Sequence, residues 1–203
     1  LPNDLALLET DQLIEKLSLE YPDYFWTPRI TFGGLLDVPD ENGETMEQGP
    51  TIALAVDFFS SGSRQVDIWE LKRRLTAGRI PEKPQEVLLS TKLAERLGLE
   101  PGEVVTFIGS TMHNAFTTYN FMVSGTFNLN MGAIDKQMML LDISGARIAL
   151  DMDYAASEIL GYSHDLYYND DDAVSLRLAF NASHSDSSDI FSPFMLALRD
   201  GSQ

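Results

Sequence analysis

The chain has 203 residues, of which 31 are acidic and 14 are Lys or Arg, so its formal charge at pH 7 is −17. This acidic excess excludes proteins that bind nucleic acid by neutralising phosphates, and it argues against binding to anionic membrane surfaces through basic clusters. Hydrophobic residues make up 44%, enough for a folded core, and the length suits one large domain or two small ones. The lack of cysteine excludes disulfides, thiolate metal sites and cysteine nucleophiles.

The charge is unevenly distributed along the chain. Residues 1–62 carry a net −10, residues 63–136 carry +1 and residues 137–203 carry −8. This pattern is expected if the middle is a separate structural unit, and equally if the acidic residues simply lie on solvated helix faces. The longest apolar runs are far shorter than the roughly 18 residues of a transmembrane helix. Because the sequence starts at Leu1 rather than Met, we expect a segment of a longer polypeptide.

The first third of the chain predicts a helix followed by two strands. In order, the predicted elements are helix 4–19, strand 24–36, an acidic loop or hairpin tip 37–50, and strand 51–58. Thr10 with Asp11 can instead open a shorter helix, because both residue types favour the N-cap region. Tyr21-Pro22 ends the helix, since the residue before proline avoids helical backbone angles.

The middle of the chain contains several local capping signals. The predicted elements are turn 60–63, helix 67–77, connector 79–86, strand 87–89, helix 91–97 and strand 104–108. Gly78 is expected as the left-handed end of the first of these helices. Ser90 caps the second helix, and Gly98 with Leu99 has the order of a Schellman ending. Pro101-Gly102 predicts a type II turn before the next strand.

The last part of the chain alternates short strands and helices. The predicted elements are a polar hairpin tip 109–120, strand 121–128, turn 130–135, strand 137–141, helix 144–152, strand 156–162, helix 170–182, turn 183–189 and an apolar segment 191–198. The ends of the chain are therefore expected to be α/β and the middle β-rich. The fold class predicted from this order is α+β.

No catalytic motif is visible in the sequence. A phosphate-binding glycine loop, a GxSxG elbow and an HExxH zinc motif are all lacking. The histidines His113, His164 and His184 fall in predicted loops or at a predicted helix end, so a Ser-His-Asp triad would need assembly in space. We therefore expect no catalytic residue and no cofactor.

The run Asp170–Asp172 allows two interpretations. Clustered carboxylates can bind a hard cation, but the glycine and distal Glu of an EF-hand loop are missing. Acidic residues at the start of a helix also oppose the positive end of its dipole, and we favour this structural interpretation. We expect no metal.

Trp26 and Trp69 are interpreted as packing residues, and Asn181 opens a formal glycosylation sequon.

A series of short motifs runs through most of the chain. They are Glu86-Val-Leu-Leu-Ser90, Leu93-Ala94, Leu97-Gly98-Leu99, Pro101-Gly102-Glu103-Val104-Val105, Phe121-Met-Val123-Ser-Gly125-Thr-Phe127 and Ala146-Arg147, preceded by strand 51–57 and by Ala77-Gly78-Arg79-Ile80. Together they resemble the MacB-like extracytoplasmic core domains of ABC transporter permeases of the FtsX-like and lipoprotein-releasing (LolC/LolE-like) kind. The block from Leu93 to Gly102 is the most specific part.

The resemblance implies a discontinuous fold. A porter-like α/β subdomain would comprise 1–83 and 137–203, with a small β-rich sabre-like subdomain, 84–136, inserted into it. The domain would lie between transmembrane helices on the periplasmic face of the inner membrane. The −10, +1 and −8 charge pattern matches this partition.

The resemblance also implies a function by movement rather than reaction. Cytoplasmic ATP hydrolysis would move the domain and thereby a substrate or partner, as in lipoprotein release, peptide or drug export, or signalling. The implied partners are an ABC ATPase reached through transmembrane helices, a second permease copy and a periplasmic protein. Met112, Phe116 and Tyr119, on the predicted tip, are candidates for a partner contact. The alternative is a free-standing acidic hydrolase or carbohydrate-binding module that uses Asp170–Asp172.

Overall fold

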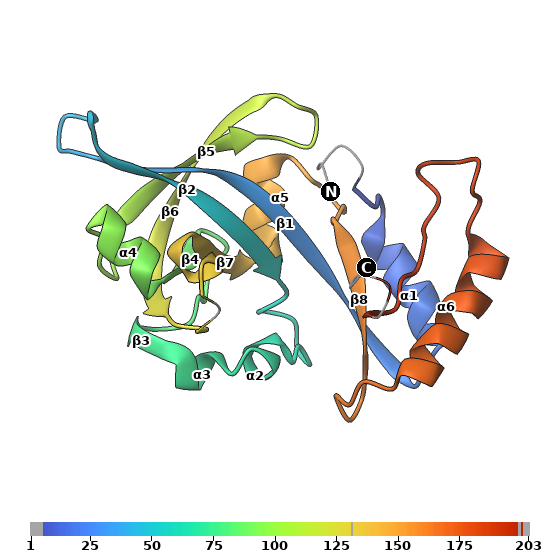
Figure 1. The fold of residues 1–203 in the computed structure, drawn as a ribbon. Helices are drawn as coiled ribbons and strands as arrows, with labels where there is room; N and C mark the ends of the chain where they lie inside the picture. Colours follow the sequence, from blue (N-terminus) through green and yellow to red (C-terminus); the bar gives the residue numbers. More distant parts are fainter. Residues whose placement is uncertain (1–5, 131, 199, 201–203) are drawn as a thin grey trace. The chain divides into compact units, whose positions relative to one another are not determined.

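The structure is a computed structural model that describes residues 6–130, 132–198 and 200. Contacts divide the chain into two compact units. Unit 1 comprises residues 1–10 and 27–159, and unit 2 comprises residues 11–26 and 160–203. The boundaries fall inside two strands, β1 (Tyr24–Pro39) and β8 (Glu158–Ser163), so each of these strands contributes to both units (Figure 1).

Unit 1 is built on a ring of six strands. Its members are β1, β2 (Thr45–Val56), β4 (Glu86–Ser90), β5 (Val104–Ser110), β6 (Phe116–Phe127) and β7 (Met138–Asp142). The pairing order is β1–β2–β7–β4–β6–β5, and β5 pairs with β1 again. The β2–β7 and β4–β6 pairs are parallel, and the other four pairs are antiparallel. The sheet therefore closes on itself as a small barrel.

Alternate residues of the six strands fill the inside of the barrel. The fully buried side chains include Ile30, Leu36, Val87, Leu89, Val105, Phe107, Phe121, Val123, Met139 and Leu141. The rings of Phe32 and Phe107 meet edge to face, with their centroids 5.3 Å apart. The small residue Ala53 lies opposite Phe32 in the pairing of β1 with β2. A Cβ at Gly34 would lie 2.4 Å from the Phe107 ring, so only glycine leaves room for that ring.

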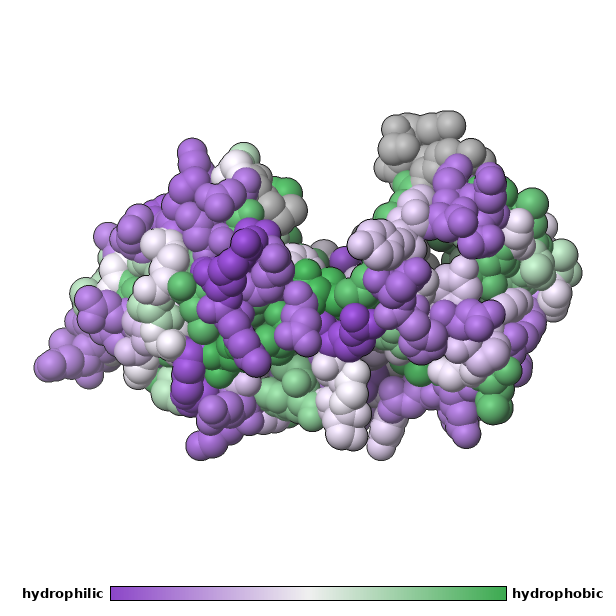
Figure 2. Space-filling model, turned by 90° about the horizontal axis from the view of Figure 1, so that it is seen from below, coloured by the Kyte–Doolittle hydropathy of each residue, from purple (hydrophilic) through white to green (hydrophobic). Residues whose placement is uncertain are grey.

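Strands β4 and β7 are buried on their outer face as well. Leu88 and Leu140 belong to a second apolar cluster that includes Leu71 and Phe127, all fully buried. Two short helices contribute to this cluster, α2 (Gln65–Ile68) and α3 (Leu71–Arg74). They lie at the bottom of Figure 1, on the side that Figure 2 shows, where hydrophobic side chains (green) are mixed with hydrophilic ones (purple).

The single helix predicted over 67–77 is wrong. It is broken at Glu70, whose left-handed backbone (φ 50°) separates α2 from α3. Residues Leu75–Gly78 then form strand β3, which pairs with β6. Gly78 does have a positive φ of 71°, but it ends a strand rather than a helix. Pairing with β6 outweighs the helical spacing of the apolar residues.

The two longer helices of unit 1 match their predictions. In α4 (Thr91–Leu97), the Ser90 hydroxyl accepts a hydrogen bond from the Leu93 N–H, and Gly98 (φ 65°) ends the helix. The Leu99 N–H donates to the Ala94 carbonyl at 2.9 Å, as in a Schellman ending. Helix α5 (Ile143–Leu150) is capped by Asp142. Both helices pack their apolar faces on the barrel core.

The hairpin of β1 and β2 is longer than predicted. Residues 37–50, expected as a loop or tip, are paired except for the turn at 40–44. Asp37, only 9% exposed, accepts hydrogen bonds from Thr45 (2.6 Å) and Gln48 (3.4 Å), so its carboxylate is satisfied within the strand. A short 3₁₀ turn (Ile134–Lys136) precedes β7.

The compact units do not divide where the sequence predicted subdomain boundaries, at 83/84 and 136/137. Strand β4, expected in the inserted subdomain, pairs with β7, expected in the other one. Strand β5 likewise pairs with β1. These pairings hold both segments in one barrel, so the porter-like and sabre-like partition stays a prediction. The general α+β class agrees with the observed mixture of helices and strands.

Unit 2 joins segments from the two ends of the chain. It contains helix α1 (Thr10–Glu20) from Asp11 onward, the first residues of β1, the last residues of β8, and helix α6 (Asp170–His184). Leu17 and Phe180 are buried, and the rings of Phe25 and Tyr162 stack at 5.2 Å. The shorter helix starting at Thr10 is confirmed in place of 4–19, whose first two residues lie outside the described part. Within the described residues, no helix is long and apolar enough to cross a membrane.

Candidate functional site

Of the predicted contact residues, Met112 lies in the turn between β5 and β6 and Phe116 begins β6, whereas Tyr119 lies within β6, opposite Phe107. The tip is docked on α5, because the Met112 N–H donates to the Leu150 carbonyl at 2.8 Å and the Thr117 hydroxyl donates to the Ala149 carbonyl. Met112 and Tyr119 are half-buried and pack against the barrel core. Phe116, by contrast, is 76% exposed.

Two of the three candidates therefore support the fold. The Tyr119 ring lies 4.8 Å from that of Phe121, which is fully buried. Period-two alternation along β6 turns Phe121 and Tyr119 inward, and the tip turn folds Met112 back onto the core. Only Phe116 presents a large apolar surface for a partner, and its role as a contact stays a prediction.

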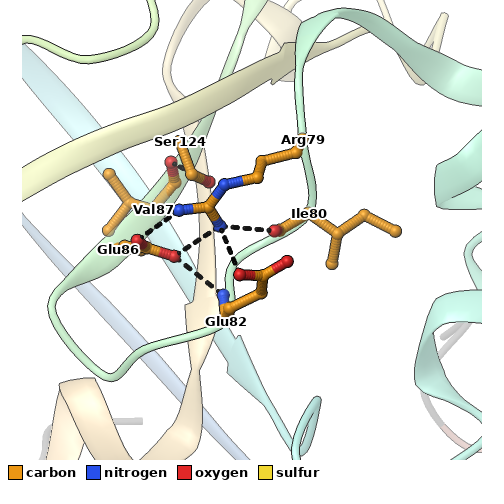
Figure 3. A network of polar contacts seen from close by, with 6 residues as sticks. All are labelled: Arg79, Ile80, Glu82, Glu86, Val87 and Ser124. Carbon is orange, nitrogen blue, oxygen red and sulfur yellow. Dashed lines mark hydrogen bonds and ion pairs between the residues drawn. The ribbon is translucent and has the colours of Figure 1, made fainter.

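A network of polar contacts lies beside the barrel, where Arg79 pairs with Glu86 (Figure 3). The guanidinium donates to both carboxylate oxygens, from Nη1 at 2.8 Å and from Nη2 at 2.6 Å. The same carboxylate accepts the Glu82 N–H at 2.8 Å. Arg79 Nη1 also donates to the Ile80 carbonyl and lies 3.6 Å from Glu82 Oε2. The Glu86 side chain is fully buried, whereas that of Arg79 is 45% exposed.

Glycines hold this network close to the barrel. The Arg79 N–H donates to the Ser124 carbonyl, and a Cβ at Gly125 would lie 2.7 Å from the Arg79 carbonyl oxygen. At the far end of the connector, a Cβ at Gly145 would lie 2.1 Å from the Pro84 carbonyl oxygen. The connector from Arg79 to Glu86 is thus fixed at both ends by backbone contacts that side chains would block.

The electrostatics of the network make Glu86 a permanent anion. Hydrogen bonds from Arg79 and then from the Glu82 N–H lower the pKa of Glu86 from 4.5 to about 2, against the opposing effect of burial. A covered carboxylate of this kind cannot exchange protons near neutral pH. Its role is to tie the connector to the start of β4, and we name Arg79, Glu82 and Glu86 the connector clamp.

The acidic run at 170–172 lies in the first turn of α6. Asn169 is the N-cap: its side-chain oxygen accepts from the Asp171 and Asp172 N–H groups at 3.0 and 3.3 Å. The carboxylates follow at positions where they oppose the helix dipole, which is the structural interpretation favoured from the sequence. Within the described part of the chain, no group of three or more His, Asp and Glu side chains could hold a metal ion.

The histidines have separate surroundings. His113 Nε2 lies 3.8 Å from an Asp151 oxygen, both side chains being exposed. His164 Nε2 lies 3.1 Å from the Pro22 carbonyl, and His184 Nε2 lies 3.2 Å from Glu20. None of these three contacts joins a histidine to a serine hydroxyl, as a nucleophilic triad would require.

The tryptophans are half-buried packing residues. Trp69 belongs to the apolar cluster beside α3 and donates from Nε1 to Gln65. Trp26 lies against Gly161, where a Cβ would approach its ring within 2.5 Å. Both placements agree with the interpretation from the sequence.

Solved structures with a similar fold come from transporter proteins. The extracellular domain of the noncanonic ABC-type transporter YknZ from Gram-positive bacteria matches 88% of this chain and 84% of its own, with a TM-score of 0.57 and 14% identity. The periplasmic region of MacB from Actinobacillus actinomycetemcomitans matches 87% of this chain and 73% of its own, with a TM-score of 0.54 and 16% identity. The chain has the fold of these two domains. No protein-family model and no curated protein sequence matches it.

The shared fold confirms, at the level of structure, the MacB-like resemblance of the sequence motifs. Two of those motifs meet in the connector clamp, since Arg79 belongs to one and Glu86 begins another. The sequence contained a signal for this pair: opposite charges flank a proline-containing connector. The sequence did not predict this pairing, because a charged side chain at the start of a strand is expected to be exposed. Full burial of such a side chain is rare unless it is paired.

Proposed function

We propose that the chain is the extracytoplasmic domain of an ABC transporter permease. Its position would be on the outer side of the cytoplasmic membrane, and it would act by moving a substrate or partner while a cytoplasmic ATPase hydrolyses ATP. The observation that supports this is the fold shared over 87–88% of the chain with two domains of such transporters. A fold alone does not select a substrate, so lipoprotein release, peptide or drug export, and signalling remain alternatives.

The chemistry of the chain agrees with a mechanical role. Glu86, whose pKa is lowered to about 2, is tied into the connector clamp, and Asp170–Asp172 begin a helix. The proposed partners are an ABC ATPase, a second permease copy and an extracytoplasmic protein. Phe116 is the proposed contact for that protein, because among the three predicted contact residues it is the one that is largely exposed.

The complete reading frame tests the proposal directly. We expect an apolar stretch of about 20 residues on both sides of this segment, long enough to cross a bilayer as a helix. The whole protein should then copurify with an ABC ATPase. A reading frame without such stretches would overturn the proposal.

A variant of the whole protein tests the tip. We expect Phe116→Ser to reduce transport or partner binding with little change in stability, because the ring is 76% exposed. Met46→Ser, at an equally apolar and 65% exposed position on β2, is the matched control. Equal activity of the two variants would contradict a partner contact at Phe116.

A further inference from the structure

The C-terminal part of unit 2 contains an extended segment, residues 193–197, that belongs to no helix or strand. It runs antiparallel to α6. The Ser185 hydroxyl donates to the Pro193 carbonyl at 2.6 Å, and one turn earlier on the helix Asn181 contacts Met195. One turn earlier again, Arg177 pairs with Asp200 at 2.8 Å. The segment is therefore fixed along the helix rather than loosely attached.

The side chain of Asn181 makes the hydrogen bonds to Met195 that the backbone of a neighbouring strand would otherwise make. Its side-chain oxygen accepts the Met195 N–H at 2.8 Å, and its amide nitrogen donates to the Met195 carbonyl at 3.0 Å. The Ala197 N–H donates to an Asp200 oxygen at 2.9 Å. The Pro193 carbonyl and both backbone groups of Met195 are thus bonded to α6 and its C-cap, and the Ala197 N–H is bonded to Asp200, which pairs with Arg177 of α6. Because the Asn181 amide is used in this way, it is not free to act as the acceptor of its sequon.

The other edge of the segment is open. In an extended chain, successive residues point their N–H and C=O groups to opposite sides. Those of Phe194 and Leu196 therefore point away from α6, and they make no hydrogen bond to any residue that the structure describes. Such a row of unpaired donors and acceptors is a template for the addition of a strand.

Apolar side chains accompany the open edge. Phe194, Leu196 and Leu198 are 66%, 65% and 73% exposed, and Ile190 and Phe191 in the preceding turn are 79% and 63% exposed. Since large side chains cover roughly 150–250 Å² each, these five together expose about 500–850 Å², an area at or above the largest apolar patch of most monomers. We name these five residues the apolar strip.

The negative charge of unit 2 indicates which kind of protein segment would bind at this edge. Unit 2 has 11 acidic side chains against three basic ones, a formal charge of −8. Asp186 and Asp189 flank the apolar strip on one side, whereas Asp200, on the other side, is already paired with Arg177. A second copy of this chain would bring a like charge to the same place. An extended segment with basic residues would be attracted instead.

We propose that residues 193–197 are a docking edge for another protein, which adds an extended segment with apolar side chains and Lys or Arg. The backbone of Phe194 and Leu196 would supply the strand pairing, the apolar strip would supply the contact area, and the flanking carboxylates would select basic residues. The proposal rests on the geometry of unit 2 and does not depend on the proposed function.

The probe for this edge is a fluorescent nine-residue peptide of alternating Val and Lys, titrated into the full 203-residue chain. We expect binding that slows hydrogen exchange at the Phe194 and Leu196 amides, measured by NMR. A peptide with N-methyl groups on alternate amides should bind at least about tenfold more weakly, because it lacks the hydrogen bonds of a strand. Equal affinity of the two peptides, or unchanged exchange at both amides, would overturn the proposal.

Matched variants separate the edge from general attraction to an acidic surface. Leu196→Lys should weaken peptide binding at least about tenfold. Leu19→Lys adds the same charge at an 80% exposed leucine on α1 of the same unit and should have little effect. Equal affinities of the two variants would overturn the proposal. Sedimentation that shows a dimer abolished by Leu196→Lys would also overturn it and would identify a second copy as the occupant.

Discussion

The connector clamp makes the stability of unit 1 depend on pH through one residue. In the folded chain the pKa of Glu86 is lowered to about 2 by hydrogen bonds from Arg79, whereas the ordinary value of 4.5 applies after unfolding. The ionised carboxylate therefore stabilises the folded state above pH 4.5. This stabilisation is lost as the pH falls from 4.5 to about 2.

The size of the effect follows from the lowered pKa. A fall from 4.5 to about 2 corresponds to about 3 kcal/mol of folding free energy at about 1.4 kcal/mol per pH unit. Because the Arg79 side chain is 45% exposed, water screens part of the interaction, and we expect about 2 kcal/mol. The change to measure is Glu86→Gln, which keeps the shape of the side chain but does not titrate.

Urea unfolding of the chain and of Glu86→Gln, followed by tryptophan fluorescence between pH 7 and pH 2.5, measures the effect. The advantage of the native chain should shrink by about 2 kcal/mol over this range. Glu82→Gln is the control, because that side chain is 71% exposed and lies 3.6 Å from Arg79, so its pH profile should follow the native one. A difference between the native chain and Glu86→Gln that stays constant with pH would refute the reasoning.

Two further predictions concern backbone packing and helix capping. Gly145→Ala should destabilise unit 1 by more than about 2 kcal/mol in urea unfolding, because its Cβ would meet the Pro84 carbonyl, whereas Gly33→Ala, whose nearest neighbour is 3.6 Å away, should change stability by less than about 0.5 kcal/mol. Similar losses in the two variants would contradict the close approach at Gly145. Asn169→Ala should cost about 1 kcal/mol of stability in α6 by removing its N-cap, visible as faster amide exchange in that helix; unchanged exchange would show that the cap is dispensable.

Local signals predicted the parts of the fold that depend on a few neighbouring residues. Ser90 and Gly98 delimit α4 as expected, and Gly102 has the positive φ (103°) that a type II turn requires. Each of these signals acts within a single turn of chain, so no distant residue is needed to interpret it.

The parts of the fold that were predicted wrongly or missed depend on contacts with residues outside the local segment. Residues 75–78 have helical spacing but pair with β6, and 37–50 are acidic but extend a hairpin in which Asp37 finds Thr45. The same kind of packing makes two of the three predicted contact residues, Met112 and Tyr119, half-buried. Alternation along β6 buries one side of the Tyr119 ring, and the tip turn folds Met112 onto the core, which composition alone does not reveal.

The closed barrel also imposes an order on folding. The Thr51 hydroxyl donates to the Gln137 carbonyl, 86 residues away, and β2 pairs with β7 only after that stretch has been synthesised. Unit 2 can form only later in synthesis, because α1 and α6 come from opposite ends of the chain. Contacts of such high sequence separation form slowly, since loop closure must precede them. Helix α1, with the buried Leu17, therefore lacks the C-terminal part of its unit until residues 160–203 have been synthesised, and a chaperone or rapid completion of the chain would have its greatest effect in that interval.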